Sequence, residues 1–238
     1  MPITLNRLSQ AFLMTAVLLS TAIPCTAQPV DQAPPGVQMS ASELGKKLEV
    51  GDVVFIQIPS LPFRKVADTT SSWTNHVGMV TDVTGAEPVI AESRVPFSGE
   101  TTWSRFVERS DQGRVAITRL PARLDQHQQS KLKQAVAARR GILYDAGFDL
   151  HSRRQFCSRY VREVLDEAVG VKLGEIENFS TLLNRNPQAD QTFWRVWYFG
   201  SIPWQRETVT PASLLRDGQM QLVFDGRVQN NNQYGEKK

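Results

Sequence analysis

"RRQFCSRYVREVLDEAVG" (residues 153–170) contains one of the two cysteines of this 238-residue chain. Its apolar residues recur at i, i+4 and i+7, which predicts an amphipathic helix with the cysteine near its start. The residues on the apolar face are Cys157, Val161, Val164, Leu165 and Ala168. Ser152 and Gln155 fit a capping box, and a start at Gln155 itself is the alternative. In both cases Cys157 lies in the first or second turn.

The N-terminal stretch "MPITLNRLSQAFLMTAVLLSTAIPCTAQP" (residues 1–29) has the build of a secretory signal. Arg7 precedes an apolar run, and small residues follow it, so we expect residues 1–27 to be a signal peptide that is removed. An uncleaved anchor is the alternative, but the run is shorter than the roughly 20 residues of a spanning helix. Lipidation of Cys25 is a further alternative, which Pro24 disfavours. The sequence therefore predicts a periplasmic or secreted protein with no integral membrane span after cleavage.

Removal of the signal peptide leaves Cys157 as the single cysteine of the mature chain. Exported proteins normally pair their cysteines, so an unpaired one indicates an intermolecular bond or a reactive thiol. A small buried hydrophobe is the structural alternative. Because Val or Ala would fill a core equally well without the reactivity, we favour a functional thiol.

Composition excludes several classes of protein. A hydrophobic content of 41% and a charged content of 21% are ordinary for a globular domain. The net charge is only +3, with Lys and Arg scattered, so nucleic acid is not an expected partner. The three histidines lie far apart in sequence, and no glycine-rich phosphate loop is present, so we expect neither a metal nor another cofactor.

The order of predicted elements indicates an α+β domain. We expect a Pro- and Gln-rich flexible leader over 28–47 that ends in a short helix, a single domain over 48–225, and a disordered polar tail over 226–238. Runs rich in Val and Ile predict strands at 52–58, 76–83, 87–95, 113–120 and 220–226. Helical patterns occur at 40–48, 124–140, 153–170, a segment that ends near Asn186, and 209–215.

A catalytic thiol requires a base, and the base requires an orienting group. His127 lies among solvated residues, and His151 lies in a charged loop close to the cysteine. His76 is the best candidate, because it begins a predicted strand in "WTNHVGMVTDV" (residues 73–83).

Glu92 is the candidate orienting group, because it lies on the next predicted strand. A hairpin that turns at 83–85 would place Glu92 directly opposite His76, with Cβ atoms about 4.5–5.5 Å apart. A slip of one residue would put the two side chains on opposite faces. Taken singly, His76 is more simply a core histidine and Glu92 an exposed strand residue; together with a lone cysteine they indicate a site.

The start of a helix suits a reactive thiol. The helix dipole and a protonated His76 would both favour the thiolate of Cys157, and Arg153 and Arg154 add positive potential. The backbone N–H of Cys157 is not committed inside the helix, so it could stabilise an oxyanion.

At these residues the chain resembles the permuted papain-like amidases of the YaeF, YiiX and YebB type, most closely the YebB-like members. The resemblance runs from about Val50 to Leu215. The blocks that carry it are "GDVVF" (51–55), "WTNHVGMV" (73–80), "VIAESRVP" (89–96), "TTWSRFVERS" (101–110), "RQFCSRYV" (154–161), "LGEIENF" (173–179) and "TFWRVWYFGSIPWQRETVTPASL" (192–214). It implies a circularly permuted papain-like fold, an antiparallel sheet packed against helices. It also implies Cys157 as nucleophile, His76 as base and Glu92 as the third polar residue.

The resemblance leaves the substrate open, since related proteins act on cell-wall peptides or on lipids. We expect a thiol amidase or peptidase that forms a covalent acyl-enzyme on a cell-envelope peptide. A lipid-directed acyltransferase or hydrolase on the same triad is the first alternative, and a non-catalytic binding module is the second. Trp194, Trp197 and Trp204 could wall a cleft or cap the sheet, and we favour the cap.

Overall fold

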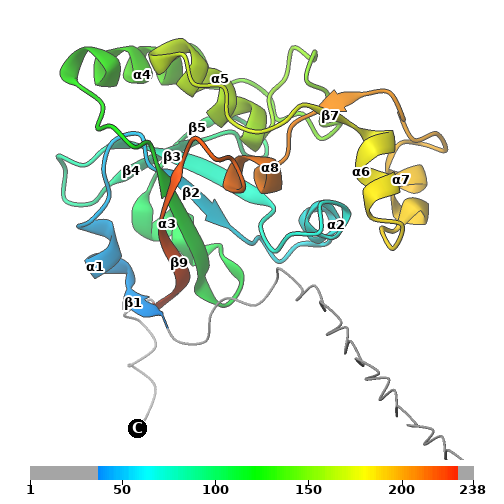
Figure 1. Ribbon diagram of the computed structural model, residues 1–238, viewed down its shortest axis with the longest axis horizontal. Coiled ribbons are helices and arrows are strands. Elements are labelled where there is room, and N and C mark those ends of the chain that lie inside the picture. Colours follow the sequence, from blue (N-terminus) through cyan, green and yellow to red (C-terminus); the bar gives the residue numbers. More distant parts are fainter. Residues whose placement is uncertain (1–36, 230–238) are drawn as a thin grey trace, which may run out of the picture.

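The computed structural model describes residues 37–229, which form one α+β unit (Figure 1). The expected signal peptide, most of the expected leader and the last residues of the expected tail lie outside the described residues. Within residues 37–229 no helix has the length and apolarity needed to cross a membrane.

The centre of the fold is a seven-stranded sheet with the order β1-β9-β6-β2-β3-β4-β5. Its neighbouring strands are antiparallel except for β1 and β9, which are parallel. The strands are β1 (Gln38–Ser40), β2 (Val53–Ile56), β3 (His76–Asp82), β4 (Val89–Glu92), β5 (Gly99–Thr102), β6 (Arg114–Arg119) and β9 (Gln221–Gln229). A separate two-stranded sheet pairs β7 (Glu177–Asn178) with β8 (Glu207–Thr208).

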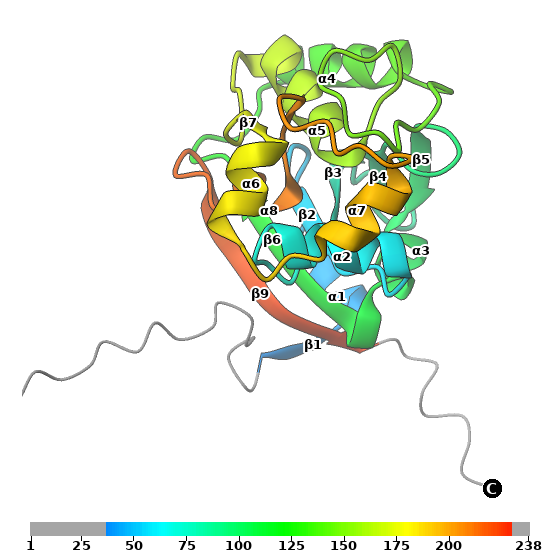
Figure 2. The same ribbon diagram turned by 90° about the vertical axis from the view of Figure 1, so that its right-hand side faces the viewer.

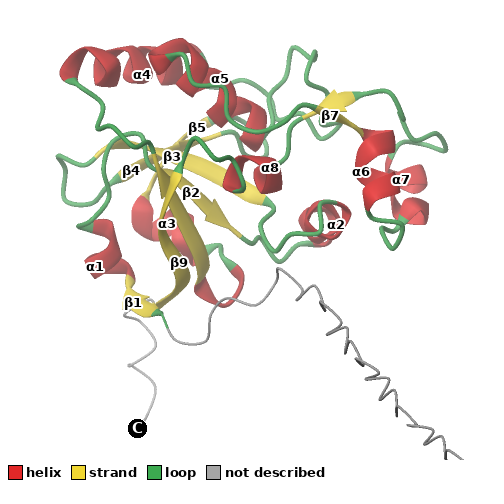
Figure 3. Cartoon of the chain, in the orientation of Figure 1, coloured by secondary structure: helices red, strands yellow, loops and turns green. Residues whose placement is uncertain are grey.

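Helices cover both faces of the large sheet (Figures 1 and 3). The helices are α1 (Ala41–Gly45), α2 (Leu61–Thr69), α3 (Trp103–Glu108), α4 (Gln126–Ala138), α5 (Cys157–Val169), α6 (Phe179–Arg185), α7 (Gln191–Trp197) and α8 (Pro211–Leu215), with a 3-10 turn at Asp111–Gly113. On one face Val53 and Phe55 pack with α4 and α5. On the other face Val54 and Ile56 pack with α1 and α3. Alternate residues of one strand therefore supply two different cores, as the period of two requires.

Helices α6 and α7 lie beside the sheet rather than over its centre (Figure 1), and α2 is next to them (Figures 1 and 2). Their core contains Phe179, Leu183, Ala189, Trp194 and Ile202. The prediction that the tryptophans cap the sheet is therefore wrong for Trp194, which packs in this separate core of α6 and α7.

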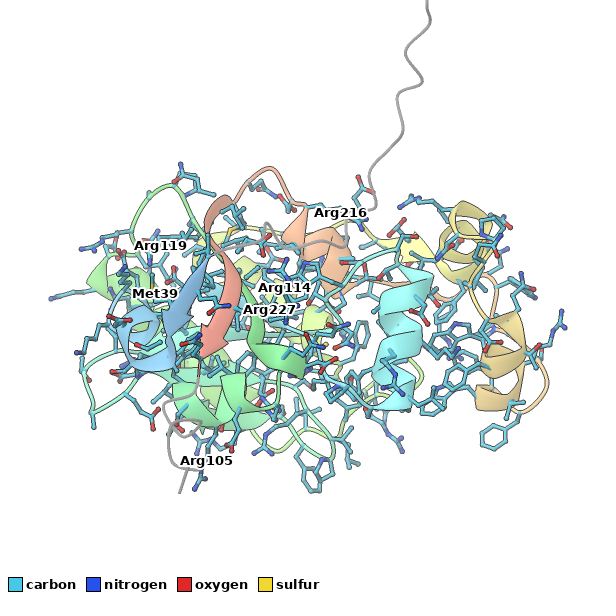
Figure 4. The ribbon with its side chains drawn as sticks, turned by 90° about the horizontal axis from the view of Figure 1, so that it is seen from below. Met39, Arg105, Arg114, Arg119, Arg216 and Arg227 are labelled. Carbon is cyan, nitrogen blue, oxygen red and sulfur yellow. The ribbon has the colours of Figure 1, made fainter. Side chains whose placement is uncertain are left out.

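The folded part extends beyond the expected range of 48–225 at both ends. Ser40 caps α1 through a capping box with Glu43, and β1 pairs with β9, so residues 38–45 are structured rather than a flexible leader. β9 continues to Gln229, and Arg227 in its last part donates to the carbonyl of Gln112 (3.0 Å; Figure 4). These additions depend on pairing between the two ends of the chain, which local composition does not reveal.

The cysteine helix begins later than the capping-box pattern predicts. Its N-cap is Phe156, so Cys157 is its first residue. The Ser152 hydroxyl accepts from the N–H of Arg154 (3.0 Å), and the N–H of Gln155 donates to the carbonyl of Leu143 (3.0 Å). The carbonyl of Gln155 accepts from the N–H of Asp145 (2.8 Å), so it is not available to a helix and α5 begins after it.

Candidate active site

The hairpin of β3 and β4 carries His76 and Glu92, with a register that differs from the predicted one. Met79 pairs with Ala91 and Val80 with Ile90. Continuing this ladder puts Glu92 opposite Gly78, so the prediction that it directly opposes His76 is wrong by two residues. An even slip keeps every side chain on its face, and a diagonal neighbour remains within reach of a glutamate.

Gly78 lets the adjacent helix approach this face closely. A Cβ atom at position 78 would lie 2.6 Å from Cγ2 of Ile90 and 2.8 Å from Cε2 of Phe106 on α3. The Phe106 ring consequently reaches the His76 ring, with centroids 5.8 Å apart. On another side the Phe63 ring meets His76 edge-on at 5.9 Å. The imidazole is therefore enclosed between two aromatic rings.

Glu92 holds one nitrogen of His76. Nε2 of His76 lies 2.5 Å from Oε2 of Glu92, and both side chains are 0% exposed. Nη2 of Arg109 donates to both carboxylate oxygens, at 2.8 and 2.9 Å, and Nε of Arg94 lies 3.5 Å from Oε1. Burial alone would raise the pKa of Glu92, but the hydrogen bonds and charges of His76 and Arg109 lower it below its ordinary value. Glu92 is therefore a buried, ionised acceptor.

Arg109 was not identified from the sequence. It follows α3 as the helix C-cap and reaches Glu92 across the sheet face. Its guanidinium also lies over the Phe106 ring, 5.0 Å from the centroid. A lone arginine in a block of mixed charges carries no local signal, so only the packing of α3 on β4 reveals this contact.

His76 is poised between Glu92 and Cys157. Burial would lower the pKa of His76, but its interactions with the Cys157 thiol and with Glu92 outweigh burial and raise the pKa to about 9. Nδ1 has no hydrogen-bond partner among the described residues. Since Glu92 occupies Nε2, Nδ1 is the nitrogen left to exchange a proton with the thiol. The structure thus brings together the three residues predicted from sequence.

Cys157 is buried at the first position of α5. At this position a backbone N–H has no acceptor within its own helix. The hydroxyl of Ser158 donates to the carbonyl of Val209 (2.7 Å), which attaches the first turn to the segment before α8. The thiol therefore lies beside a backbone donor in a turn that is held in place.

Tyr144 is a further polar group at the sulfur, which the sequence did not single out. Its side chain is buried, and its hydroxyl has no hydrogen-bond partner among the described residues. Burial raises the pKa of Tyr144 well above its ordinary value, and interaction with Cys157 raises it further. An unsatisfied buried hydroxyl costs about 1–3 kcal/mol, and beside the thiol this one is free to donate to a bound substrate.

A small apolar cavity of about 30 Å³ lies next to Cys157. Its apolar lining includes Val66, Phe148, Phe179, Leu182 and Trp194. Thr69, Thr70, Leu182 and Thr210 also line a larger polar cavity of about 410 Å³, whose lining includes Arg185 and Arg216. Arg216 is labelled in Figure 4. The thiol is thus reached from a narrow apolar pocket that continues into a wider polar one.

The other two histidines lie apart from this site. His127 is exposed in the first turn of α4, as expected. His151 is also exposed, and its Nε2 lies 2.8 Å from a carboxylate oxygen of Glu207. Over residues 37–229 no group of three or more His, Cys, Asp and Glu side chains is arranged to hold a metal ion.

Comparison with known proteins identifies the family and agrees with the fold. Residues 47–224 match the family described as permuted papain-like amidase enzyme, YaeF/YiiX, C92 family. The uncharacterized protein YiiX of Escherichia coli K12 is 25% identical over 175 residues, which cover 74% of this chain and 85% of YiiX. The crystal structure of metalloprotein yiiX from Escherichia coli O157:H7 superposes with a TM-score of 0.69 at 25% identity, and the match covers 75% of this chain and 98% of that one.

Proposed function

Because the chain belongs to the permuted papain-like amidase family, we propose that it is a thiol hydrolase that cleaves an amide bond through an acyl-Cys157 intermediate. The observation that carries this proposal is the position of His76, with Nε2 on buried Glu92 and Nδ1 left for the thiol. The narrower resemblance to YebB-like members stays a prediction.

In the proposed reaction Nδ1 of His76 takes the proton of the Cys157 thiol. The thiolate then attacks the amide carbonyl carbon, and the negative charge moves to the carbonyl oxygen. The imidazolium returns its proton to the departing amine as the C–N bond breaks. Water, deprotonated by His76, then attacks the thioester and releases the carboxylic acid and the thiol.

Two donors are available for the oxyanion. The backbone N–H of Cys157 lies at the positive end of α5, which favours negative charge. The unpartnered hydroxyl of Tyr144 is the second donor, since it lies beside the sulfur.

Glu92 and Arg109 act through His76. The carboxylate holds the imidazole by Nε2 and stabilises its protonated form, and Arg109 keeps the buried carboxylate ionised. Glu92 itself does not take up the proton.

The pocket supports an amide of a peptide as substrate. A cavity of about 30 Å³ next to the sulfur is close to the volume of one water molecule, so it suits a small group rather than a long acyl chain. The cavity beyond it is lined by Arg185 and Arg216 and also by Glu175, Glu177 and Asp217, so it suits the polar remainder of a peptide rather than an acyl chain. With the signal-like residues 1–27, this supports an exported enzyme that acts on an envelope peptide.

A metal has no place in the proposed mechanism. The relative from Escherichia coli O157:H7 is described as a metalloprotein. In this chain, however, both oxygens of Glu92 accept from Arg109 and one of them also contacts His76, so Glu92 is not available as a metal ligand. Among residues 37–229 no third His, Cys, Asp or Glu side chain joins His76 and Cys157 in an arrangement that could hold a metal, so the site does not fit a metal centre.

The experiment that tests the function compares the wild type with Cys157→Ala and Cys157→Ser on peptidoglycan fragments, aminoacyl amides and phospholipids. We expect turnover of an amide by the wild type alone, and mass spectrometry should detect the acyl group on Cys157. Rapid alkylation by iodoacetamide in the native state distinguishes an enzyme from a binding module, because an inert buried thiol reacts slowly. Equal turnover by the variants would exclude Cys157 as the nucleophile.

A further inference from the structure

Three segments lie side by side at the rim of the active site, just before α5 begins. The N–H of Tyr144 donates to the carbonyl of Pro96 (2.9 Å), and the N–H of Gln155 donates to the carbonyl of Leu143 (3.0 Å). The loop between β4 and β5 is thereby joined to the loop between α4 and α5, near the label β5 in Figure 2. Because Glu92 ends β4 and Cys157 starts α5, this surface adjoins the site on both sides.

This rim exposes large apolar side chains. Val95 is 61% exposed, and Phe97 and Leu143 are each 48% exposed. Phe97 and Leu143 face each other across an isolated antiparallel bridge, so they form one patch rather than scattered residues. Contiguous exposed apolar surface marks an interaction site more often than single residues do.

Exposed arginines flank the apolar side chains. Arg94 precedes Val95, and Arg153 and Arg154 precede Gln155. Within residues 37–229, neither Arg153 nor Arg154 forms an ion pair with an acidic side chain. We define the rim patch as Arg94, Val95, Phe97, Leu143, Arg153 and Arg154.

We propose that the rim patch binds the surface of an anionic lipid bilayer. Apolar side chains of this kind enter the boundary between headgroups and acyl chains, and the adjacent cations attract anionic headgroups. The rim patch combines both features within a few residues of the thiol. The rim patch lines neither of the two cavities described next to Cys157, so docking through it leaves both cavities free for substrate. The inference goes beyond the hydrolase reaction, because binding requires no thiol.

The test is sedimentation of sucrose-loaded vesicles of phosphatidylcholine, with and without phosphatidylglycerol, using the protein without residues 1–27. We expect binding to the anionic vesicles, weak binding to pure phosphatidylcholine, and release by high salt. The pair Arg153→Gln with Arg154→Gln should lower the partition coefficient about 25-fold, since each arginine near an anionic surface contributes about fivefold. Phe97→Ser should lower it about tenfold.

Matched controls separate the rim patch from net charge and from apolar surface in general. Lys46→Gln with Lys131→Gln removes the same charge from exposed positions elsewhere, and Phe199→Ser removes a phenylalanine that is 100% exposed beyond α7. Both controls should bind as the wild type does. Cys157→Ala should also bind normally, so a failed hydrolase assay leaves this result unaffected.

Several outcomes would overturn the proposal. These are absence of binding to anionic vesicles, equal binding to pure phosphatidylcholine, or loss of binding in Phe199→Ser but not in Phe97→Ser. Binding of a fluorescent oligoglutamate peptide without any binding to vesicles would assign the rim patch to acidic peptides instead. Each variant must have a melting temperature within a few degrees of that of the wild type. If Phe97→Ser does not meet this condition, Phe97→Gln is used in its place.

Discussion

Replacing Glu92 by glutamine tests whether the site is a triad or a pair. The change preserves the shape of a side chain that is 0% exposed but removes the negative charge that lies 2.5 Å from Nε2 of His76. The side chain of Arg109 is 32% exposed, so the guanidinium it leaves unpaired can turn toward water. The main loss is therefore the stabilisation of the imidazolium.

The size of this loss follows from the structure. A buried hydrogen bond to a charged group contributes about 1.5–3 kcal/mol, and 1.36 kcal/mol corresponds to one pH unit. Without the carboxylate, protonated His76 is less stable, so the proton remains on the sulfur up to a higher pH. The midpoint of Cys157 alkylation should consequently rise by about one to two pH units. This lies within the full rise of the His76 pKa from 6.5 to about 9, to which Cys157 also contributes.

The assay measures initial rates of iodoacetamide alkylation from pH 5 to pH 10 by mass spectrometry, together with turnover at neutral pH. His76→Ala should move the alkylation curve further than Glu92→Gln, because it removes the nearest cation. Glu100→Gln makes the same chemical change on the neighbouring strand β5 and should leave the curve in place. If the Glu92→Gln curve and turnover match those of the wild type, Glu92 is a structural residue and the site is a Cys–His pair.

Three further predictions concern stability and the second oxyanion donor. Because the folded-state pKa of His76 is about 9, above its ordinary 6.5, its protonated form stabilises the fold fully below about pH 6.5. Urea unfolding should therefore show a stability that falls by up to roughly 3 kcal/mol between pH 6.5 and pH 9, and a fall of equal size in Glu92→Gln would contradict this origin. Tyr144→Phe should lower turnover and leave Cys157 alkylation intact. It should also raise the free energy of unfolding by about 1–3 kcal/mol, because it removes an unsatisfied buried hydroxyl, and a lower melting temperature would show that the hydroxyl has a partner. Gly78→Ala should cost about 1–3 kcal/mol in denaturant unfolding because its Cβ meets two side chains at under 3 Å, and a neutral result would mean that α3 shifts freely.

The sequence by itself determined which side chains could meet. Side chains alternate between the two faces of a strand. His76 and Glu92 therefore lie on the same face of the hairpin in any register that is shifted from the predicted one by an even number of residues. The register in the structure differs from the predicted one by two residues, and the contact survives. Likewise, the apolar stripe of the cysteine helix correctly predicted that Cys157 is buried near the start of the helix. The predicted capping box of Ser152 and Gln155 was wrong, because the N-cap is Phe156.

Only the tertiary structure decided which groups complete the site. Arg109 reaches Glu92 because α3 packs over β4 beside Gly78, and Tyr144 reaches the thiol through a loop bridged to Gln155. The first and last residues of the domain are set by the pairing of β1 with β9, which join the two ends of the described residues. Such contacts join residues far apart in sequence and leave no periodic trace in it, because their energy comes from packing and long-range pairing rather than from local preference.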